Sequence, residues 1–235
     1  MNKVKLHTLW LLGMLFLMTA CGDDDYYYPS VKLEFVTVKA GADGLIQSLL
    51  PDKGELLTVA KDRTGSTISP NSARRVISNY EVNPEDATAV IYSLQSVVTP
   101  EPKADDPAFE GGLKYDPVDV TSIWLGRDYL NMILNVKINI NSGKQHVFGM
   151  IEESVEAEGD ETVVTLSLFH DANGDEENYN RRAYISVPLT KYVDEENPHQ
   201  TIRIKFKYHT TDKSGVVVES SKYCDPGFEY VPGVN

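Results

Sequence analysis

The stretch YLNMILNVKINI, residues 129–140, alternates apolar and polar side chains with a period of two. Every even position from Leu130 to Ile140 is apolar, whereas asparagine and lysine occupy most of the odd positions. Successive side chains of a β-strand point to opposite faces, so this pattern predicts a half-buried strand of an antiparallel sheet. The stretch TIRIKFKYH, residues 201–209, has the same alternation and predicts a second strand of this kind.

Shorter segments with the same alternation recur along the chain, separated by polar residues, glycines and prolines, and helical periodicity is nearly absent. Strands that follow one another without helices between them favour a sandwich or a barrel, so we expect an all-β protein of about ten strands. The shorter strands are predicted at 31–38, 55–60, 74–82, 89–98, 118–125, 146–151, 162–169 and 183–189.

The stretch TPEPKADDPAFEGGLKYDP, residues 99–117, contains too many prolines, glycines and acidic residues for a strand. We therefore predict a small OB-like barrel over residues 31–99, a linker over 100–117 and an antiparallel β-sandwich over 118–235. The size and strand number of the first part suit an OB-type barrel, and those of the second part suit a sandwich. A surface insertion within a single domain is the alternative reading of the same stretch.

The N-terminus predicts export. Lys3 and Lys5 precede an apolar run from Leu9 to Met18, which is interrupted only by Gly13. Ten helical residues rise about 15 Å, half of a bilayer core of roughly 30 Å, so the run is too short for a transmembrane helix. A basic start followed by a short apolar centre is typical of a cleaved signal peptide, which we place at residues 1–20.

Residues 18–21, Met-Thr-Ala-Cys, resemble the lipobox of bacterial lipoproteins, which implies lipidation of Cys21. A lipid on Cys21 would attach the chain to a membrane through buried acyl chains. Asp23, Asp24 and Asp25 follow in a hydrated acidic tether, residues 21–30, and resemble the surface-export signal of some Gram-negative lipoproteins. We therefore expect a protein anchored in the outer membrane and exposed on the cell surface; a periplasm-facing location is the alternative.

The formal net charge of −13 argues against a nucleic acid partner, because an acidic protein repels phosphate backbones. If Cys21 is acylated, Cys224 remains as a lone thiol with no nucleophile motif around it. A Cys21–Cys224 disulfide is the alternative use of the two cysteines.

Six phrases of the chain belong together. They are PDKGELL (51–57), ARRVISNYEV (73–82), DPV (116–118), SIWLGRDYLNMIL (122–134), LFHDANGD (168–175) and YISVPLTKY (184–192). In this order they resemble the NigD-like lipoprotein family, and they span nearly the whole mature chain. The resemblance implies an N-terminal OB-like barrel, a C-terminal β-sandwich and a suggested role in bacteriocin immunity, and it brings no catalytic residues.

The strongest candidate for a metal site is HDANGDEEN, residues 170–178. Asp171, Asn173 and Asp175 alternate as oxygen ligands do in calcium loops, but the glycine and glutamate of an EF-hand are missing at the required positions. Asn173-Gly174 between two strand-like runs instead favours a type I′ hairpin turn. We expect a turn there, no metal site and no cofactor.

Two strand faces could bind a ligand. Arg203, Lys205, Lys207 and His209 form a basic face that could bind an anionic glycan or an acidic protein, although a solvated outer face has the same pattern. The asparagines of the 130–140 strand could bind sugar hydroxyls or could simply face water.

No catalytic motif is present, and the five histidines lack the spacing of a zinc site. We therefore expect a non-catalytic binding or accessory module for an unknown protein or glycan, with bacteriocin immunity as its specific form. A structural subunit of an envelope assembly is the alternative. A glycan hydrolase would require two facing carboxylates in a cleft.

Overall fold

The computed structural model describes residues 30–104, 109, 111–175 and 179–233, and in these residues the chain is built almost entirely from β-strands. The predicted signal peptide (residues 1–20), Cys21 and Asp23, Asp24 and Asp25 lie outside the described residues. Within the described part no helix has the length and apolar character needed to cross a membrane.

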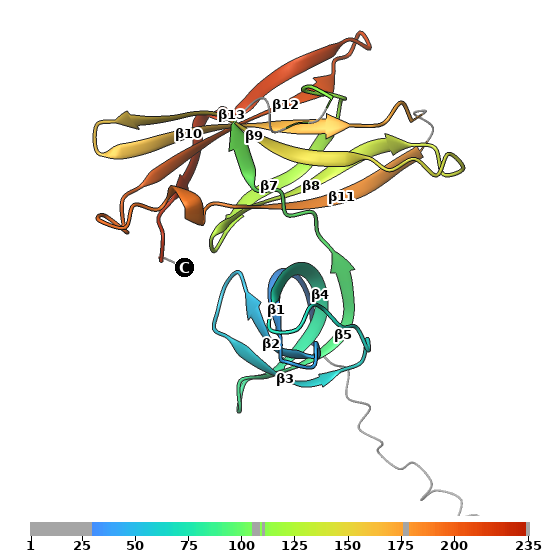
Figure 1. Cartoon of the computed structure of the whole chain (residues 1–235), viewed down its shortest axis with the longest axis vertical. Helices are drawn as coiled ribbons and strands as arrows, with labels where there is room; N and C mark the ends of the chain where they lie inside the picture. Colours follow the sequence, from blue (N-terminus) through green and yellow to red (C-terminus); the bar gives the residue numbers. More distant parts are fainter. Residues whose placement is uncertain (1–29, 105–108, 110, 176–178, 234–235) are drawn as a thin grey trace, which may run out of the picture. The chain divides into compact units, whose positions relative to one another are not determined.

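The first module is a closed five-stranded barrel. Its strands are β1 (Val31–Ala40), β2 (Ile46–Pro51), β3 (Leu57–Asp62), β4 (Ala73–Asn83) and β5 (Thr88–Ser96). They follow one another around the barrel in the order β1-β2-β3-β5-β4 (Figure 1). Alternate apolar side chains of these strands fill the interior, with Val36, Leu49 and Ile91 completely buried. The barrel confirms the expectation of an OB-like first part.

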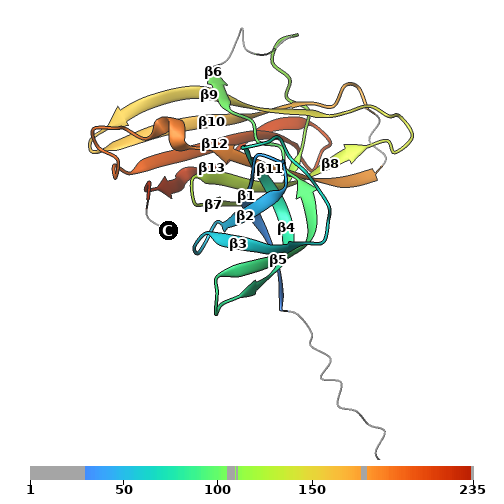
Figure 2. The ribbon, with the colours of Figure 1, turned by 60° about the horizontal axis from the view of Figure 1, so that its bottom comes forward.

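The second module is a β-sandwich, as predicted. Its strands are β6 (Pro102–Ala104), β7 (Asp119–Gly126), β8 (Tyr129–Ile138), β9 (Val147–Glu158), β10 (Glu161–Asp171), β11 (Tyr179–Pro188), β12 (Ile202–Thr211) and β13 (Val217–Tyr230). One sheet has the order β13-β12-β10-β9-β6 and the other the order β11-β8-β7. Figure 2 shows the five strands of the larger sheet side by side. The alternation of β8 predicts its inner face correctly, because Leu130, Met132 and Leu134 are completely buried in the sandwich core.

Within the predicted linker, residues 100–117, two described parts, residues 102–104 and Asp116, pair with strands of the sandwich. Strand β6 pairs in parallel with β9, and the backbone N–H of Asp116 donates to the carbonyl of His170 over 3.0 Å. A short edge strand tolerates Pro102 at its first position, which is why the density of prolines did not prevent pairing. The two turn residues Arg127 and Asp128 connect β7 to β8.

The barrel and the sandwich belong to one compact unit. The four consecutive residues Arg75 to Ser78 of β4 are all buried, because the barrel interior covers one face of this strand and the outer face of the β11-β8-β7 sheet covers the other. The side chains of Phe35 and Ile77 point out of the barrel toward this sheet. The ring of Phe35 packs edge-on against that of Trp124, with ring centroids 5.2 Å apart.

Arg75 is the polar centre of this contact. Its Nη2 donates to Asp52 Oδ1 and to Asn131 Oδ1, and its Nε donates to Ser186 Oγ over 3.0 Å. The ring of Tyr129 lies 4.3 Å from the guanidinium carbon. Arg75 and Asp52 come from the barrel, whereas the other three residues belong to β8 and β11. The guanidinium group of one barrel residue therefore connects the two modules through several hydrogen bonds.

Candidate functional site

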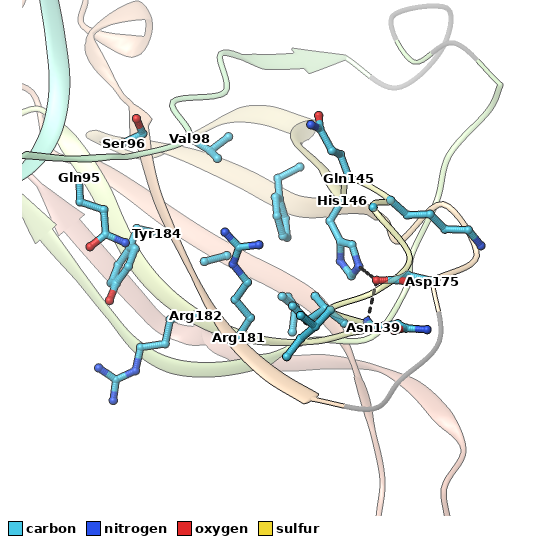
Figure 3. Close-up of a pocket in the computed structure, with 17 residues that line it drawn as sticks. Gln95, Ser96, Val98, Asn139, Gln145, His146, Asp175, Arg181, Arg182 and Tyr184 are labelled. Atoms are coloured by element: carbon cyan, nitrogen blue, oxygen red, sulfur yellow. Dashed lines mark hydrogen bonds and ion pairs between the residues drawn. The ribbon is translucent and has the colours of Figure 1, made fainter.

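The candidate site lies along β11, the edge strand of the smaller sandwich sheet. A cavity of about 560 Å³, here called the edge pocket, lies against residues 181–184 of this strand (Figure 3). The remaining walls are the end of β8 with the loop that follows it, the start of β9, and the end of β5 with residues Ser96 and Val98. The pocket therefore combines residues of both modules.

The edge of β11 is only partly covered. The N–H of Val98 donates to the carbonyl of Tyr184, and the N–H of Ser186 donates to the carbonyl of Val98, each over 2.9 Å. These two bonds form an isolated parallel bridge, and no other described segment pairs with this edge. The first half of β11, from Tyr179 to Ala183, is therefore paired with β8 on one side and open on the other.

Two arginines of β11 carry the positive charge of the site. Arg181 and Arg182 are both exposed, and neither makes a hydrogen bond or an ion pair with any described residue. Figure 3 shows the side chain of Arg181 in the pocket, between Tyr184 and His146, while Arg182 points away on the opposite side of the strand. Adjacent residues of a strand face opposite ways, so the pair places a free cation on each side of the open edge.

A histidine pair forms the opposite wall. His146 Nδ1 lies 2.9 Å from His170 Nε2, and His146 Nε2 lies 3.4 Å from Asp175 Oδ2. His170 Nδ1 lies 3.0 Å from the carbonyl oxygen of Asp116, which can only accept, so His170 donates from Nδ1. His170 Nε2 then accepts from His146 Nδ1, and the contact with Asp175 becomes an ion pair when His146 is protonated.

Burial favours the neutral form of His170, the buried histidine of this pair. Burial lowers the pKa of His170, the hydrogen bond to the Asp116 carbonyl opposes this effect, and His146 adds to the lowering. The ring of Phe148 stacks on His170 with centroids 4.7 Å apart. The hydrogen bond between the two histidines thus holds the loop after β8 against β10. Among the described residues no serine or cysteine forms a hydrogen bond with either ring, as a catalytic nucleophile would.

A second cavity of about 370 Å³, here called the junction pocket, lies between the barrel and the outer face of the smaller sheet. It shares Gln95, Arg182 and Tyr184 with the edge pocket, so the two cavities adjoin. Its apolar wall consists of Leu33, Phe35, Ile77, Trp124, Leu125 and Ile133. Binding sites commonly combine an apolar wall with a few polar groups, and the two cavities together have this composition.

The junction pocket contains two carboxylates, Glu34 and Asp52, which is the arrangement a hydrolase would need. Glu34 accepts a hydrogen bond from Tyr80 Oη over 2.7 Å, and Asp52 pairs with Arg75 and accepts from Asn131. Both acids therefore have structural partners, and nothing in their surroundings supports glycan hydrolysis.

The candidate calcium loop is a turn, although not the hairpin that the sequence indicated. Asn173 and Gly174 both have positive φ, but the strands on either side, β10 and β11, belong to different sheets. Asp171 Oδ1 accepts from the backbone N–H of Asn173, and Asp175 Oδ2 accepts from the backbone N–H of Asn139. Across the described residues no group of histidine, cysteine, aspartate or glutamate side chains could hold a metal ion.

The basic face of β12 is largely neutralised by neighbouring acids, as expected for a structural surface. Arg203 pairs with Glu161 over 2.8 Å and with Glu229 over 3.1 Å, and Lys207 pairs with Glu153 over 2.8 Å. The hydrogen bonds from Arg203 lower the pKa of Glu161.

Two other residues flagged by the sequence have structural positions. The thiol of Cys224 is free and partly buried, and its contact is the carbonyl of Phe206. Asn131, expected on the wet side of its sheet, is completely buried at the junction, because the barrel covers that face.

Sequence reasoning missed both the Arg75 junction and the histidine pair. His146 and His170 are too far apart in sequence for a motif, and only the pairing of β9 with β10 brings them together. Arg181-Arg182 was visible as two adjacent cations at the start of a strand in an acidic chain, and that contrast could have identified the site.

Comparisons with known proteins agree with this architecture. Residues 35–97 match the NigD-like N-terminal OB domain, and residues 101–219 match the NigD-like C-terminal beta sandwich domain. No curated protein matched the chain.

Solved structures with the same fold include a member of this family. A NigD-like immunity protein from Bacteroides caccae is 70% identical, covers 88% of this chain and 100% of its own, and superposes with a TM-score of 0.78. A protein of unknown function from Bacteroides vulgatus, 17% identical with a TM-score of 0.61, covers 88% of this chain and 96% of its own and shares the fold. The two domain matches and the 70% identical structure show that the chain belongs to the NigD-like family.

Proposed function

We propose that this protein is a lipid-anchored, surface-exposed immunity protein that binds a bacteriocin and prevents it from acting, without catalysis. The observation that carries the proposal is the 70% identity, over the whole of that chain, to a structure described as a NigD-like immunity protein. Identity at this level preserves the fold.

The site supports binding better than chemistry. It combines an exposed strand edge, unpaired cations and an adjoining apolar cavity, all of which recognise a partner. Its histidines and carboxylates are held by one another and by the backbone. A protein that captures a toxin needs a surface of this kind and needs no nucleophile.

Lipidation at Cys21 with the acidic tether behind it would hold the two modules at the membrane surface, where an arriving toxin is first met. Asp23, Asp24 and Asp25 would direct the chain outward, and a periplasm-facing location would place the capture step after entry of the toxin.

The test is a challenge assay in a native host. Deletion of the gene should increase killing by culture fluid from bacteriocin-producing strains of related bacteria, and the wild-type gene should restore resistance. A Cys21→Ala variant should be expressed and folded without restoring it. A deletion strain that is as resistant as the parent to all such fluids would refute the immunity proposal.

Protease treatment of intact cells, followed by immunoblotting, tests the location. Loss of the protein on intact cells is expected, whereas protection until lysis would place it on the periplasmic side.

A further inference from the structure

We propose that the open edge of β11 binds an extended, acidic segment of a protein partner by strand addition in the edge pocket. This inference rests on the proposed function in one respect, since it takes the partner to be a protein. It adds the binding site, the mode of binding and the chemistry of the recognised segment.

The backbone geometry identifies which groups would pair. The carbonyl of Tyr184 and the N–H of Ser186 point to the edge, where Val98 uses them. Backbone groups alternate in direction along a strand and β11 pairs with β8 without a register shift, so the N–H and C=O of Asn180 and Arg182 point to the same edge. No described segment pairs with them, and an added strand would continue the row that Val98 begins.

An unpaired edge is usually protected in a folded protein by charge, by a bulge or by a covering segment. Here the covering segment ends at Val98, and the edge pocket of about 560 Å³ occupies the place where the next residues of a strand would lie. In the described part of the chain this edge is thus unpaired over a length that suits a short extended segment, and it faces a space large enough to contain one.

The charges define the segment. The whole chain has a net charge of −13, yet Arg181 and Arg182 stand on the two faces of this edge without an ionic partner among the described residues. Lys144 also lines the pocket, with its ammonium group on the carbonyl of Gly174. Among the described lining residues the one carboxylate is that of Asp175, which lies beside His146. Side chains of an added strand also alternate, so carboxylates on either face could reach an arginine.

The floor of the pocket indicates which side chains of the added segment could enter it. Val136, Ile138 and Phe148 line it and pack against the sandwich core. An apolar side chain of the added segment would therefore enter the pocket between acidic neighbours. The recognised sequence is accordingly an extended run with acidic residues on both faces and an apolar residue on the face that meets the pocket.

The test is selection from a random peptide library displayed on phage, with the purified soluble protein, residues 22–235, as bait. Selected peptides should be rich in aspartate and glutamate and should carry an apolar residue among these acids. Their affinity, measured by fluorescence anisotropy, should fall more than tenfold for the Arg181→Glu/Arg182→Glu variant.

A matched pair of variants isolates the backbone contribution. Asn180→Pro removes an edge N–H that β8 does not use, so the β8 ladder is kept, and it should weaken binding about tenfold because the incoming carbonyl loses its donor. Asn180→Ala keeps the N–H and should bind as the wild type does. Unchanged thermal unfolding of both variants would show that the fold is retained.

Three results would overturn the proposal. They are selection of peptides without an acidic preference, equal binding by Asn180→Pro and Asn180→Ala, and binding of acidic polygalacturonate that depends on the arginines but not on Asn180→Pro. The last result would identify the ligand as a glycan. None of these measurements involves a toxin, so the challenge assay and the peptide assay can fail independently.

Discussion

Replacing Arg75 by methionine should destabilise the protein by about 3–5 kcal/mol, the range found when one member of a buried ion pair is removed. The side chain of Arg75 is 2% exposed and that of its partner Asp52 is 14% exposed, so solvent screens this pair only weakly. Methionine approximates the arginine stem, which keeps the packing loss small. The cost therefore comes from the polar groups left behind.

Those groups can be counted. The carboxylate of Asp52 keeps only its hydrogen bond from Asn131, and the loss of a charged hydrogen bond costs about 1.5–3 kcal/mol. Asn131 and Ser186 keep their bond to each other but lose Arg75 as a donor, at about 0.5–1.5 kcal/mol for each bond. The two estimates together reach the range expected for breaking the pair.

The measurement is urea unfolding of residues 22–235, in which Trp124 is the one tryptophan because Trp10 precedes this range. Trp124 contacts Phe35 across the junction, so its fluorescence reports separation of the modules, whereas circular dichroism reports all the strands. The two transitions should coincide in the wild type and separate in Arg75→Met. The control is Arg74→Met, since Arg74 is exposed and makes one long hydrogen bond, to Ser96 over 3.4 Å. A cost below about 1 kcal/mol for Arg75→Met, equal to that of the control, would refute the central role of the junction.

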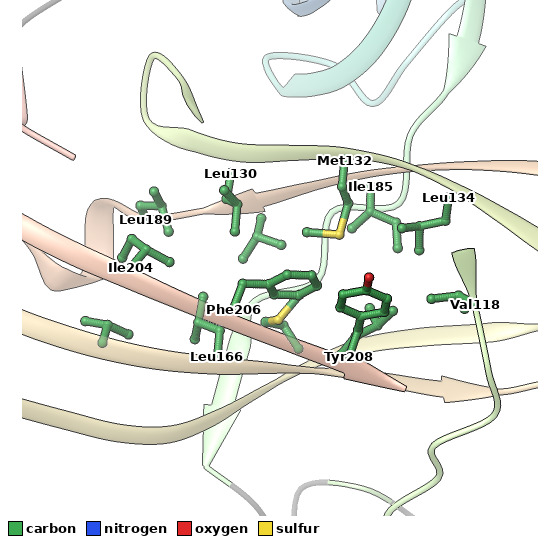
Figure 4. Packing of buried hydrophobic residues seen from close by; sticks show 14 of the residues in the cluster. Val118, Leu130, Met132, Leu134, Leu166, Ile185, Leu189, Ile204, Phe206 and Tyr208 are labelled. Atoms are coloured by element: carbon green, nitrogen blue, oxygen red, sulfur yellow. The ribbon is translucent and has the colours of Figure 1, made fainter. Parts of the chain in front are cut away.

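Three further predictions test other parts of the structure. Burial lowers the pKa of His170, so its imidazole binds a proton more readily in the unfolded chain than in the folded one. The free energy of unfolding should therefore fall as the pH decreases below about 6.5. Urea denaturation curves recorded at a series of pH values should show this fall in the wild type and a smaller one in His170→Asn. Phe206→Ala should cost about 3–5 kcal/mol in the same assay, since Phe206 is completely buried in the sandwich core (Figure 4), whereas Val218→Ala on an exposed face should cost less than about 0.5 kcal/mol. Gly126→Ala should cost about 1–3 kcal/mol, because the added methyl group would overlap the carboxylate of Asp52; an unchanged urea midpoint would contradict this packing.

The fold could be predicted from the sequence because the alternation of side chains is a local property. The pattern of Leu130, Met132 and Leu134 identified the inner face of β8, and all three are completely buried. Strand β6 could not be found in this way, because three residues carry no period and Pro102 argues against a strand. Its pairing depends on β9, whose edge is not visible from residues 102–104.

The opposite face of β8 shows the limit of the same reasoning. Asparagine at position 131 indicated solvent exposure, which is the usual environment of a polar face. The structure instead covers that face with the barrel and satisfies Asn131 with Arg75, Asp52 and Ser186, which come from three other strands or loops. A buried polar group of this kind depends on partners distant in sequence, so a local pattern cannot reveal it.

The junction also explains why the edge of β11 is open where it is. Ser186 and Tyr184 face the barrel, and the chain leaving the barrel passes β11 at this level, so Val98 covers the edge beside these two residues. The N-terminal end of β11 lies farther along the sheet than that connection extends. The backbone N–H and C=O groups of Asn180 and Arg182 on this edge therefore have no partner among the described residues. Covering the whole edge would require a longer segment between β5 and β6 than the five residues that separate Ser96 from Pro102. The contact that fixes the barrel to the sandwich thus leaves a strand edge, two arginines and a cavity in one place.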